Sequence, residues 1–168
     1  MMRLRTGLMA LCLTLLPALA FAQGAQVAFG GLKQDTSLPV EVTADELRVN
    51  QADGTAIFTG NVLIGQGEMR LSANRVQVEY ATENGQQSGD IQRMHATGNV
   101  VLVNGGEAAE AQEAIYTLAS GSIVMTGDVI LTQGLSALSG QRLVVDLQAG
   151  TGQMEGRVKT IFQPGANQ

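Results

Sequence analysis

The residue types that could support catalysis are few in this 168-residue chain, and none of them occurs at a catalytic spacing. His95 is the only histidine, and the single cysteine is Cys12. A metal site needs several nitrogen, sulfur or carboxylate ligands that converge, and the carboxylates here fall on outward-facing positions. Ser72, Ser136 and Ser139 have no neighbouring base to activate a hydroxyl. The sequence therefore predicts no metal centre, no cofactor and no enzyme.

The remaining candidates for chemistry are carboxylates and glycine-rich turns. Asp128 and Asp146 could form an acid–base pair, but neither lies in an apolar context that would raise the pKa of a carboxyl group. The glycine-rich turns do not precede helices, so a phosphate-binding loop is not supported. We find no candidate active site.

The first 22 residues are predicted to be a cleaved signal peptide. Arg3 and Arg5 form a positive start, residues 7–19 are apolar, and Ala20-Phe21-Ala22 fits the small-x-small pattern of a signal peptidase site. A membrane anchor is the weaker alternative, because the apolar run is short for a bilayer. The protein is therefore expected to be exported, with cleavage after Ala22.

The chain that remains after cleavage is acidic and contains no cysteine. Without Arg3 and Arg5 it has eight basic and fifteen acidic residues, a net charge of −7. An acidic chain that lacks both a basic cluster and tryptophan argues against nucleic-acid binding and against an anionic membrane surface. With no disulfides, its stability must come from packing and strand pairing. The length fits one domain.

A short phrase recurs along this domain. Thr-Gly-Asn-Val or Thr-Gly-Asp-Val surrounds Gly60, Gly98 and Gly127, and a more divergent copy, Glu-Gly-Arg-Val, surrounds Gly156. Successive glycines of these copies are 38, 29 and 29 residues apart. Each copy lies between apolar, β-prone runs, where glycine permits a bulge or corner. A second phrase, such as Ala-Asn-Arg-Val at residues 73–76, repeats at 29, 38 and 29 residues. The polar residues 82–90 account for the nine extra residues, so the sequence predicts a repeating β architecture with one insert.

Alternation of apolar and polar residues predicts strands from residue 38 onward and no convincing helix. Residues 106–114 are rich in alanine and glutamate, but their place in the repeat favours a strand. One face of the strands is expected to point inward, comprising Val40, Val42, Leu47, Val49, Val62, Ile64, Val76, Val78, Tyr80, Val100, Leu102, Ala114, Tyr116, Leu118, Val129, Leu131, Leu143, Val145 and Leu147. On physical grounds alone, this face could form a dry core or a groove for a lipid, since both bury the same residues.

The expected organisation is a signal peptide (1–22), a loose leader (23–37), one β domain (38–163) and a disordered tail (164–168). The first and last strands of the domain would be unpaired edges, and exposed edges invite another strand. The residues expected at these strand-pairing interfaces are Val40, Glu41, Val42, Thr43, Val158, Lys159, Thr160, Ile161 and Phe162.

These repeats resemble the LptA (OstA-like) family of periplasmic lipopolysaccharide-transport bridge proteins of Gram-negative bacteria. The likeness runs from about residue 36 to residue 164 and is strongest at 38–45, 58–67, 71–76 and 125–129. It implies an all-β fold, a twisted V-shaped antiparallel β-jelly roll of about 14–16 short strands with an open hydrophobic groove. Two departures are the missing basic C-terminal tail and the insert at 82–90.

The resemblance also implies a function. A member of this family would bind the acyl chains of lipid A, the lipid part of lipopolysaccharide, and would assemble head-to-tail in the periplasm during outer-membrane assembly. Its partners would be further copies of itself, an inner-membrane bitopic component and the periplasmic domain of the outer-membrane translocon, and it would need no nucleotide. A strand-pairing scaffold of the same fold without lipid cargo is the alternative.

The family's lipid-contacting positions correspond to Thr36, Val40, Leu102, Tyr116 and Leu118. They agree in phase with the inner face that alternation predicts. The expected lipid-binding residues are therefore Thr36, Val40, Val42, Leu47, Val49, Val62, Ile64, Val76, Val78, Leu102, Tyr116, Leu118, Val129, Leu131 and Val145.

Overall fold

The computed structural model describes residues 25–28, 33–83 and 86–161. The predicted signal peptide, the predicted tail and Phe162 lie outside these residues, so the structure does not test these predictions. No helix able to cross a membrane occurs among the described residues.

The described chain is all-β, which confirms the predicted fold class. Its eleven strands are β1 (Ala25–Ala28), β2 (Glu41–Thr43), β3 (Glu46–Asn50), β4 (Thr55–Gln66), β5 (Met69–Glu83), β6 (Gln86–Asn104), β7 (Glu107–Thr117), β8 (Ser122–Gln133), β9 (Ser136–Asp146), β10 (Thr151–Glu155) and β11 (Lys159–Ile161). Strands β4 to β9 are long because each continues through a corner, so the described residues form fewer strands than the 14–16 short ones that the resemblance implied. The alanine- and glutamate-rich segment is strand β7, as expected.

The recurring phrase forms the corners of the fold. In β4 the backbone of Gly60 has φ of +78°, that of Asn61 has φ of +45°, and the β4–β5 register shifts between Thr59 and Val62. The same shift occurs in β6 at residues 97–100 and in β8 at residues 126–129. Two successive residues in the left-handed region form a bulge that bends the strand, and glycine adopts that region without strain.

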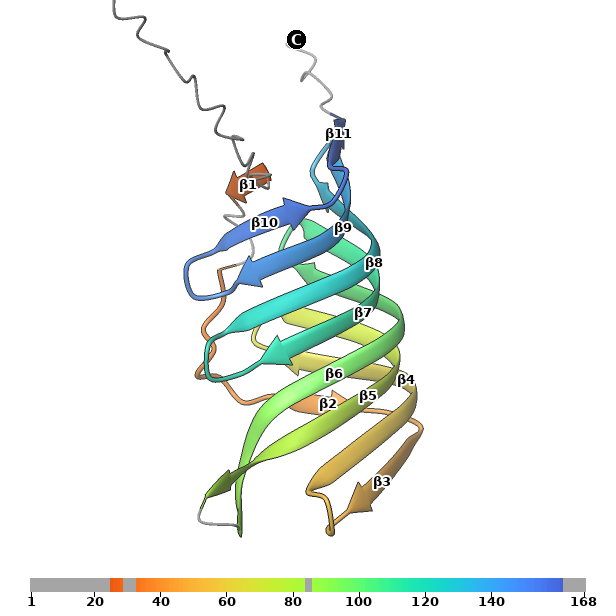
Figure 1. Ribbon diagram of the computed structural model, residues 1–168, viewed down its shortest axis with the longest axis vertical. Coiled ribbons are helices and arrows are strands. Elements are labelled where there is room, and N and C mark those ends of the chain that lie inside the picture. The colour runs from red at the N-terminus through yellow and green to blue at the C-terminus, as the bar shows by residue number, and fades with distance from the viewer. Residues whose placement is uncertain (1–24, 29–32, 84–85, 162–168) are drawn as a thin grey trace, which may run out of the picture.

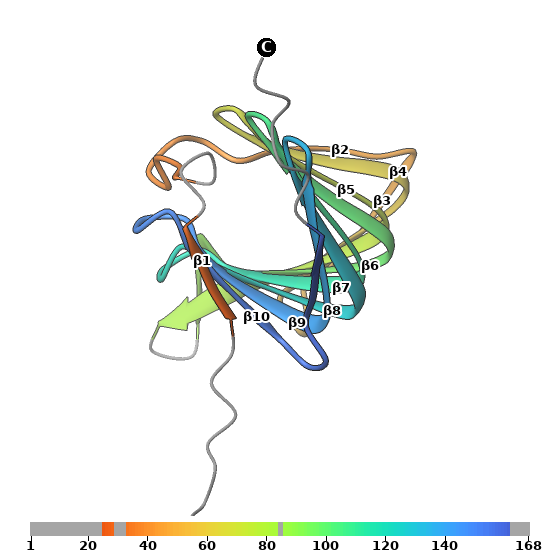
Figure 2. The same cartoon turned by 90° about the horizontal axis from the view of Figure 1, so that it is seen from above.

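The corners divide the sheet into two halves that face each other. Half-sheet A contains β3, residues 55–59 of β4, the equivalent arms of β5 to β9, β10 and β1. Half-sheet B contains β2, residues 62–66 of β4, the equivalent arms of β5 to β9, and β11. All of the pairings are antiparallel. Viewed from above, the halves meet at the corners and diverge toward the side where β1 lies (Figure 2).

The ends of both half-sheets are short strands (Figure 1). β2 and β3 both pair with β4 at one end, and β11 pairs with β9 at the other. Within the 23–37 segment, β1 pairs with β10 from Ala25–Met154 to Ala28–Thr151, so part of the predicted leader is a strand. The 82–90 insert lengthens the β5–β6 hairpin, where Thr82 pairs with Gln87.

Replacing a corner glycine should destabilise the fold. Gly98→Ala is expected to lower the free energy of unfolding by about 1–3 kcal/mol, because alanine is strained at φ of +79° and its Cβ would lie 2.8 Å from Nδ2 of Asn74. Gly106→Ala is the matched control, since Gly106 lies in a turn at negative φ with open space around it. Urea unfolding measures both variants, and equal destabilisation would contradict the role of the corner.

Candidate functional site

The space between the two half-sheets is lined by continuous rows of apolar side chains. Facing residues in antiparallel strands point to the same side of the sheet. One row of half-sheet A runs across six strands and contains Ala56, Val78, Met94, Tyr116, Ile123 and Val145. One row of half-sheet B contains Ile64, Leu71, Leu102, Ala109, Leu131 and Leu138. All twelve side chains are at most 4% exposed, so this interior is closed to solvent here.

The structure brings most of the predicted inner-face residues into this interior. Val62, Ile64, Val76, Val78, Leu102, Tyr116, Val129, Leu131 and Val145 are buried. Val40, Val42 and Leu118 are half-buried and pack against the cluster, and Thr36 is half-buried. The alternation argument therefore predicted the correct phase of these strands.

Leu47 and Val49 are in the inward phase but are exposed to solvent. They pair with the inward-facing Phe58 and Ala56, yet Leu47 is 52% exposed and Val49 is 62% exposed. The reason is their position, because β3 is the end strand of half-sheet A and half-sheet B does not cover it. Both side chains extend the apolar lining to the open end of the molecule.

A row of polar side chains borders the apolar lining at the free edge of half-sheet B. We call the polar side chains of this row the rim, which consists of Gln66, Asn104, Glu107 and Gln133. The buried Met69, which pairs with Gln66, lies between Gln66 and Asn104 in the same row. Gln66, Asn104 and Glu107 are at most 5% exposed. Nε2 of Gln133 donates to Oε1 of Glu107 at 2.6 Å, whereas Nδ2 of Asn104 has no hydrogen-bond partner among the described residues. Sequence reasoning missed the rim, although Gln66 and Asn104 continue the inward alternation of Val62–Ile64 and Val100–Leu102 by one step.

Tyr116 joins the two half-sheets across the interior. It belongs to half-sheet A, and its hydroxyl donates a hydrogen bond to Oε1 of Gln66 in half-sheet B at 2.7 Å. Burial raises the pKa of the Tyr116 hydroxyl, and the hydrogen bond to Gln66 acts in the opposite direction. Tyr116 is therefore neutral and acts as a hydrogen-bond donor at ordinary pH.

The raised pKa of Tyr116 predicts a loss of stability in alkali. The hydroxyl ionises near pH 10 in the unfolded chain and at higher pH in the folded one, so stability falls as pH rises above about 10. Tyr116→Phe should cost about 1 kcal/mol at pH 7 through the lost hydrogen bond, and should lack this part of the alkaline loss. Thermal unfolding of both proteins from pH 7 to pH 11 tests this, and parallel curves would contradict it.

Residues 34–40 cross the open side between the half-sheets, and we call them the strap (Figure 2). The backbone N–H of Gln34 donates to the carbonyl of Leu147 in half-sheet A at 2.8 Å, and its side chain donates to the carbonyl of Gln66 in half-sheet B at 2.8 Å. Nε2 of Gln66 in turn donates to the carbonyls of Thr36 and Leu38 at 3.0 and 2.9 Å. The strap is thus hydrogen-bonded to both half-sheets.

Two glycines allow the strap to approach the sheet edges. A Cβ at Gly67, in the β4–β5 turn, would collide with the side chains of Gln34 and Leu38. A Cβ at Gly121, in the β7–β8 turn, would lie 3.1 Å from Cγ2 of Thr36. These turns lie at the free edges of opposite half-sheets, so the strap closes the mouth of the interior.

The other candidates for chemistry do not form a site. Nε2 of His95 lies 2.5 Å from Oε1 of Glu113 on the outer face of half-sheet A. Asp128 is at a corner and accepts from Gln112, whereas Asp146 caps the turn after β9. Among the described residues, no group of three potential metal ligands converges.

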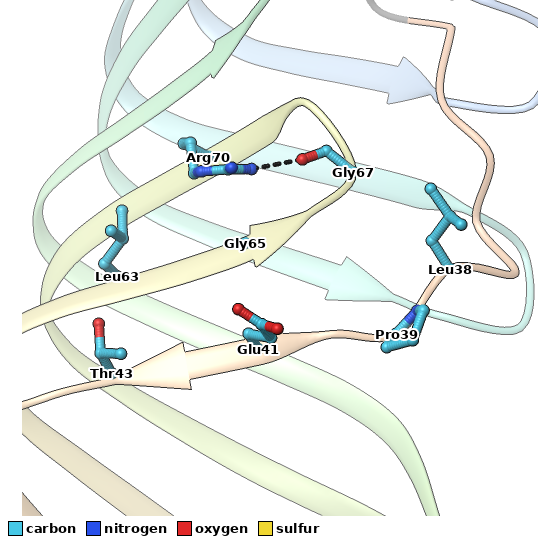
Figure 3. Close-up of a pocket in the computed structure, with 8 residues that line it drawn as sticks. All are labelled: Leu38, Pro39, Glu41, Thr43, Leu63, Gly65, Gly67 and Arg70. Carbon is cyan, nitrogen blue, oxygen red and sulfur yellow. Dashed lines mark hydrogen bonds between the residues drawn. The ribbon is translucent and has the colours of Figure 1, made fainter.

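A hollow of about 380 Å³ lies on the outer face beside β2 (Figure 3). Its floor includes Gly65 and Gly67, with Glu41 on one side and Arg70 on the other. Nη1 of Arg70 donates to the carbonyls of Gly67 and Met69 at 2.6 and 2.8 Å. Glu41 and Arg70 each face Gly65 in the register, on the side opposite to the inward-facing Ile64, so the hollow is separate from the apolar interior.

Residues 41–151 match the family described as the LptA/(LptD N-terminal domain) LPS transport protein. The chain belongs to this family. The match extends from β2 to the start of β10 and includes three of the corners and the whole rim. It confirms the resemblance that the repeats indicated.

Relatives and a solved structure agree with this assignment. An uncharacterized protein of Rhizobium meliloti is 30% identical over 115 residues, which are 67% of this chain and 62% of that protein. The LPS-assembly protein LptD of Salmonella typhimurium is 43% identical over 70 residues, which are 41% of this chain but 9% of LptD. The aligned part thus spans less than two thirds of either relative.

The crystal structure of LptH, described as the LptA-homologous periplasmic component of the lipopolysaccharide transport device of Pseudomonas aeruginosa, has the same fold. Its TM-score is 0.66 at 19% identity, covering 78% of this chain and 99% of LptH. At this identity, the match supports the fold alone.

Proposed function

We propose that this protein is a periplasmic carrier of lipopolysaccharide that binds the acyl chains of lipid A between its half-sheets. The observation that supports this most is the unbroken apolar lining, which runs across all the long strands and is bordered by polar groups only at the mouth. Such a lining suits a ligand with several alkyl chains and one polar end. Membership of a lipopolysaccharide transport family supports the same ligand.

We also propose that copies assemble head-to-tail. β2 and β11 are the end strands of half-sheet B, and such strands offer unpaired backbone groups to a neighbouring chain. The inward-facing Leu47 and Val49 are exposed at the β3 end, where a second copy would cover them. The same ends would pair with an inner-membrane component and with the periplasmic domain of an outer-membrane translocon.

Site-specific photocrosslinking in cells tests the lipid proposal. A photoreactive phenylalanine analogue at Tyr116 should give adducts with lipopolysaccharide, because this side chain lies in the interior. The same analogue at Glu79, an outward-facing residue that pairs with Arg93, is the control and should give none.

Absence of adducts at both positions, in a folded and exported protein that self-associates, would contradict the carrier function. It would favour the scaffold that pairs strands without lipid cargo. Adducts at Glu79 alone would contradict the assigned faces of the sheet.

A further inference from the structure

The proposed carrier function requires an entrance for the lipid, because the apolar interior is closed to solvent. A ligand that enters from the side has to pass between the free edges of the half-sheets, since the corners join the halves on the other side. The strap lies across that entrance and is held there by the amide group of Gln66.

The hydrogen bonds of Gln66 indicate what replaces the strap. The Nε2 group of Gln66 donates hydrogen bonds to two carbonyl oxygens of the strap, those of Thr36 and Leu38. Its Oε1 is occupied by the Tyr116 hydroxyl, which keeps the Nε2 group directed toward the strap. A buried amide donor must find an acceptor, so a group that displaces the strap has to bring its own carbonyl or hydroxyl oxygen.

Asn104 supplies a second donor on the same rim. Its side chain is 2% exposed, and its Nδ2 has no hydrogen-bond partner among the described residues. Buried polar groups without partners are rare in folded proteins, and they call for an explanation. Asn104 is two strands from Gln66, which corresponds to about 10 Å at the usual strand spacing.

We propose that the strap occupies the subsite that receives the carbonyl groups of an acylated ligand, and that Gln66 and Asn104 are the donors of this subsite. This inference rests on the proposed carrier function. Carbonyls of Thr36 and Leu38 hold the places of ester or amide carbonyls in the closed form. The next row inward, which contains Ile64, Leu71 and Leu102, then contacts the alkyl chains.

This arrangement distinguishes acyl chains from plain hydrocarbon. An ester or amide carbonyl accepts a hydrogen bond as a peptide carbonyl does, whereas an ether-linked alkyl chain has no carbonyl to offer. Entry of an acylated ligand exchanges the strap's hydrogen bonds for equivalent ones, while entry of a hydrocarbon leaves the donors buried without partners.

A reversible disulfide tests the strap. In Thr36→Cys/Gly121→Cys, the sulfur of residue 36 would lie close to the place of Cγ2 of Thr36, which is 3.1 Å from a Cβ at Gly121, a spacing that a disulfide accepts. The chain after the signal peptide has no other cysteine. We expect purified lipid A to bind at least about tenfold more weakly to the oxidised form than to the same protein after reduction with dithiothreitol.

Equal binding of lipid A by the oxidised and reduced forms, together with binding by the unmodified protein, would overturn the proposed displacement of the strap and leave the carrier function intact. No binding by the unmodified protein would overturn the carrier function itself. If only the double variant fails to bind lipid A, hydrogen exchange on the unmodified protein tests whether the strap is displaced. Lipid A should speed exchange of the Gln34 amide, which donates to Leu147, and unchanged exchange would overturn the proposal.

A second experiment tests the donors. The unmodified protein should bind an ester-linked monoacyl glycerophosphocholine about threefold to tenfold more tightly than its ether-linked analogue. Asn104→Leu should reduce this preference, whereas Asn74→Leu, at an exposed corner position, should retain it. Equal binding of both lipids by the unmodified protein, or an unchanged preference in Asn104→Leu, would overturn the role of the rim as a carbonyl subsite.

Discussion

Leu102→Ala is expected to lower the free energy of unfolding by about 2–5 kcal/mol. Leu102 is 0% exposed in the middle of half-sheet B, where it faces Leu71 and Ala109 on the neighbouring strands. Truncation removes buried methyl groups and leaves a cavity that the surrounding sheets cannot fully close, because their backbones are fixed by ladder hydrogen bonds. Urea unfolding followed by circular dichroism gives the change.

Leu63→Ala is the matched control for this truncation. Leu63 carries the same side chain in the same half-sheet, but it points outward and is 41% exposed. Its truncation should change the free energy of unfolding by no more than about 0.5 kcal/mol. A loss at Leu63 as large as that at Leu102 would show that the inward and outward faces are assigned wrongly.

Replacing Leu47 and Val49 together by aspartate is expected to weaken self-association by about 30-fold or more. Each side chain is roughly half exposed, so covering the remainder in an end-to-end contact contributes about 1 kcal/mol per residue, and about 1.4 kcal/mol corresponds to a factor of ten. Burying two carboxylates in that contact adds a further cost. Sedimentation equilibrium of the purified proteins measures the association constant.

Arg48→Asp is the control for this double variant. It changes the net charge by the same amount, −2, and it lies between the two residues on β3, but its side chain points to the outer face and is 75% exposed. It should leave self-association nearly unchanged. If the double variant associates as tightly as the unmodified protein, the β3 end is not an assembly surface.

The repeated sequence motifs predicted most of the fold because they contain the residue types that the backbone needs at each corner. Gly60, Gly98 and Gly127 are followed by Asn or Asp, the residues that best tolerate a left-handed conformation after glycine, so the corners could be located from the sequence. Alternation then determined which side chains share a face, because its period of two is fixed by the geometry of a strand. Agreement among copies overruled the helix propensity of residues 106–114, which lie in and next to strand β7.

The alternation also specified more of the candidate site than we derived from it. Gln66 and Asn104 are in the inward phase, one step beyond the last apolar residue of β4 and β6. The predicted inner face included only apolar residues and Thr36, so the polar side chains that continue the same phase were missed. The exposure of Leu47 and Val49 could not be predicted, because alternation gives the direction of a side chain and does not say whether another layer covers it.

The sequence by itself determined the all-β class, the corners, the phase of the strands and membership of a lipopolysaccharide transport family. The fold class, the corners and the phase follow from interactions within a strand or between adjacent strands, which a short repeat encodes directly. The family follows from the match over residues 41–151. Only the tertiary structure decided that Tyr116 reaches Gln66 across 50 positions, that the strap closes the mouth, and that Asn104 is buried without a partner. Those features depend on how far apart two facing half-sheets lie and on what crosses between them, and no local pattern of residues records that distance.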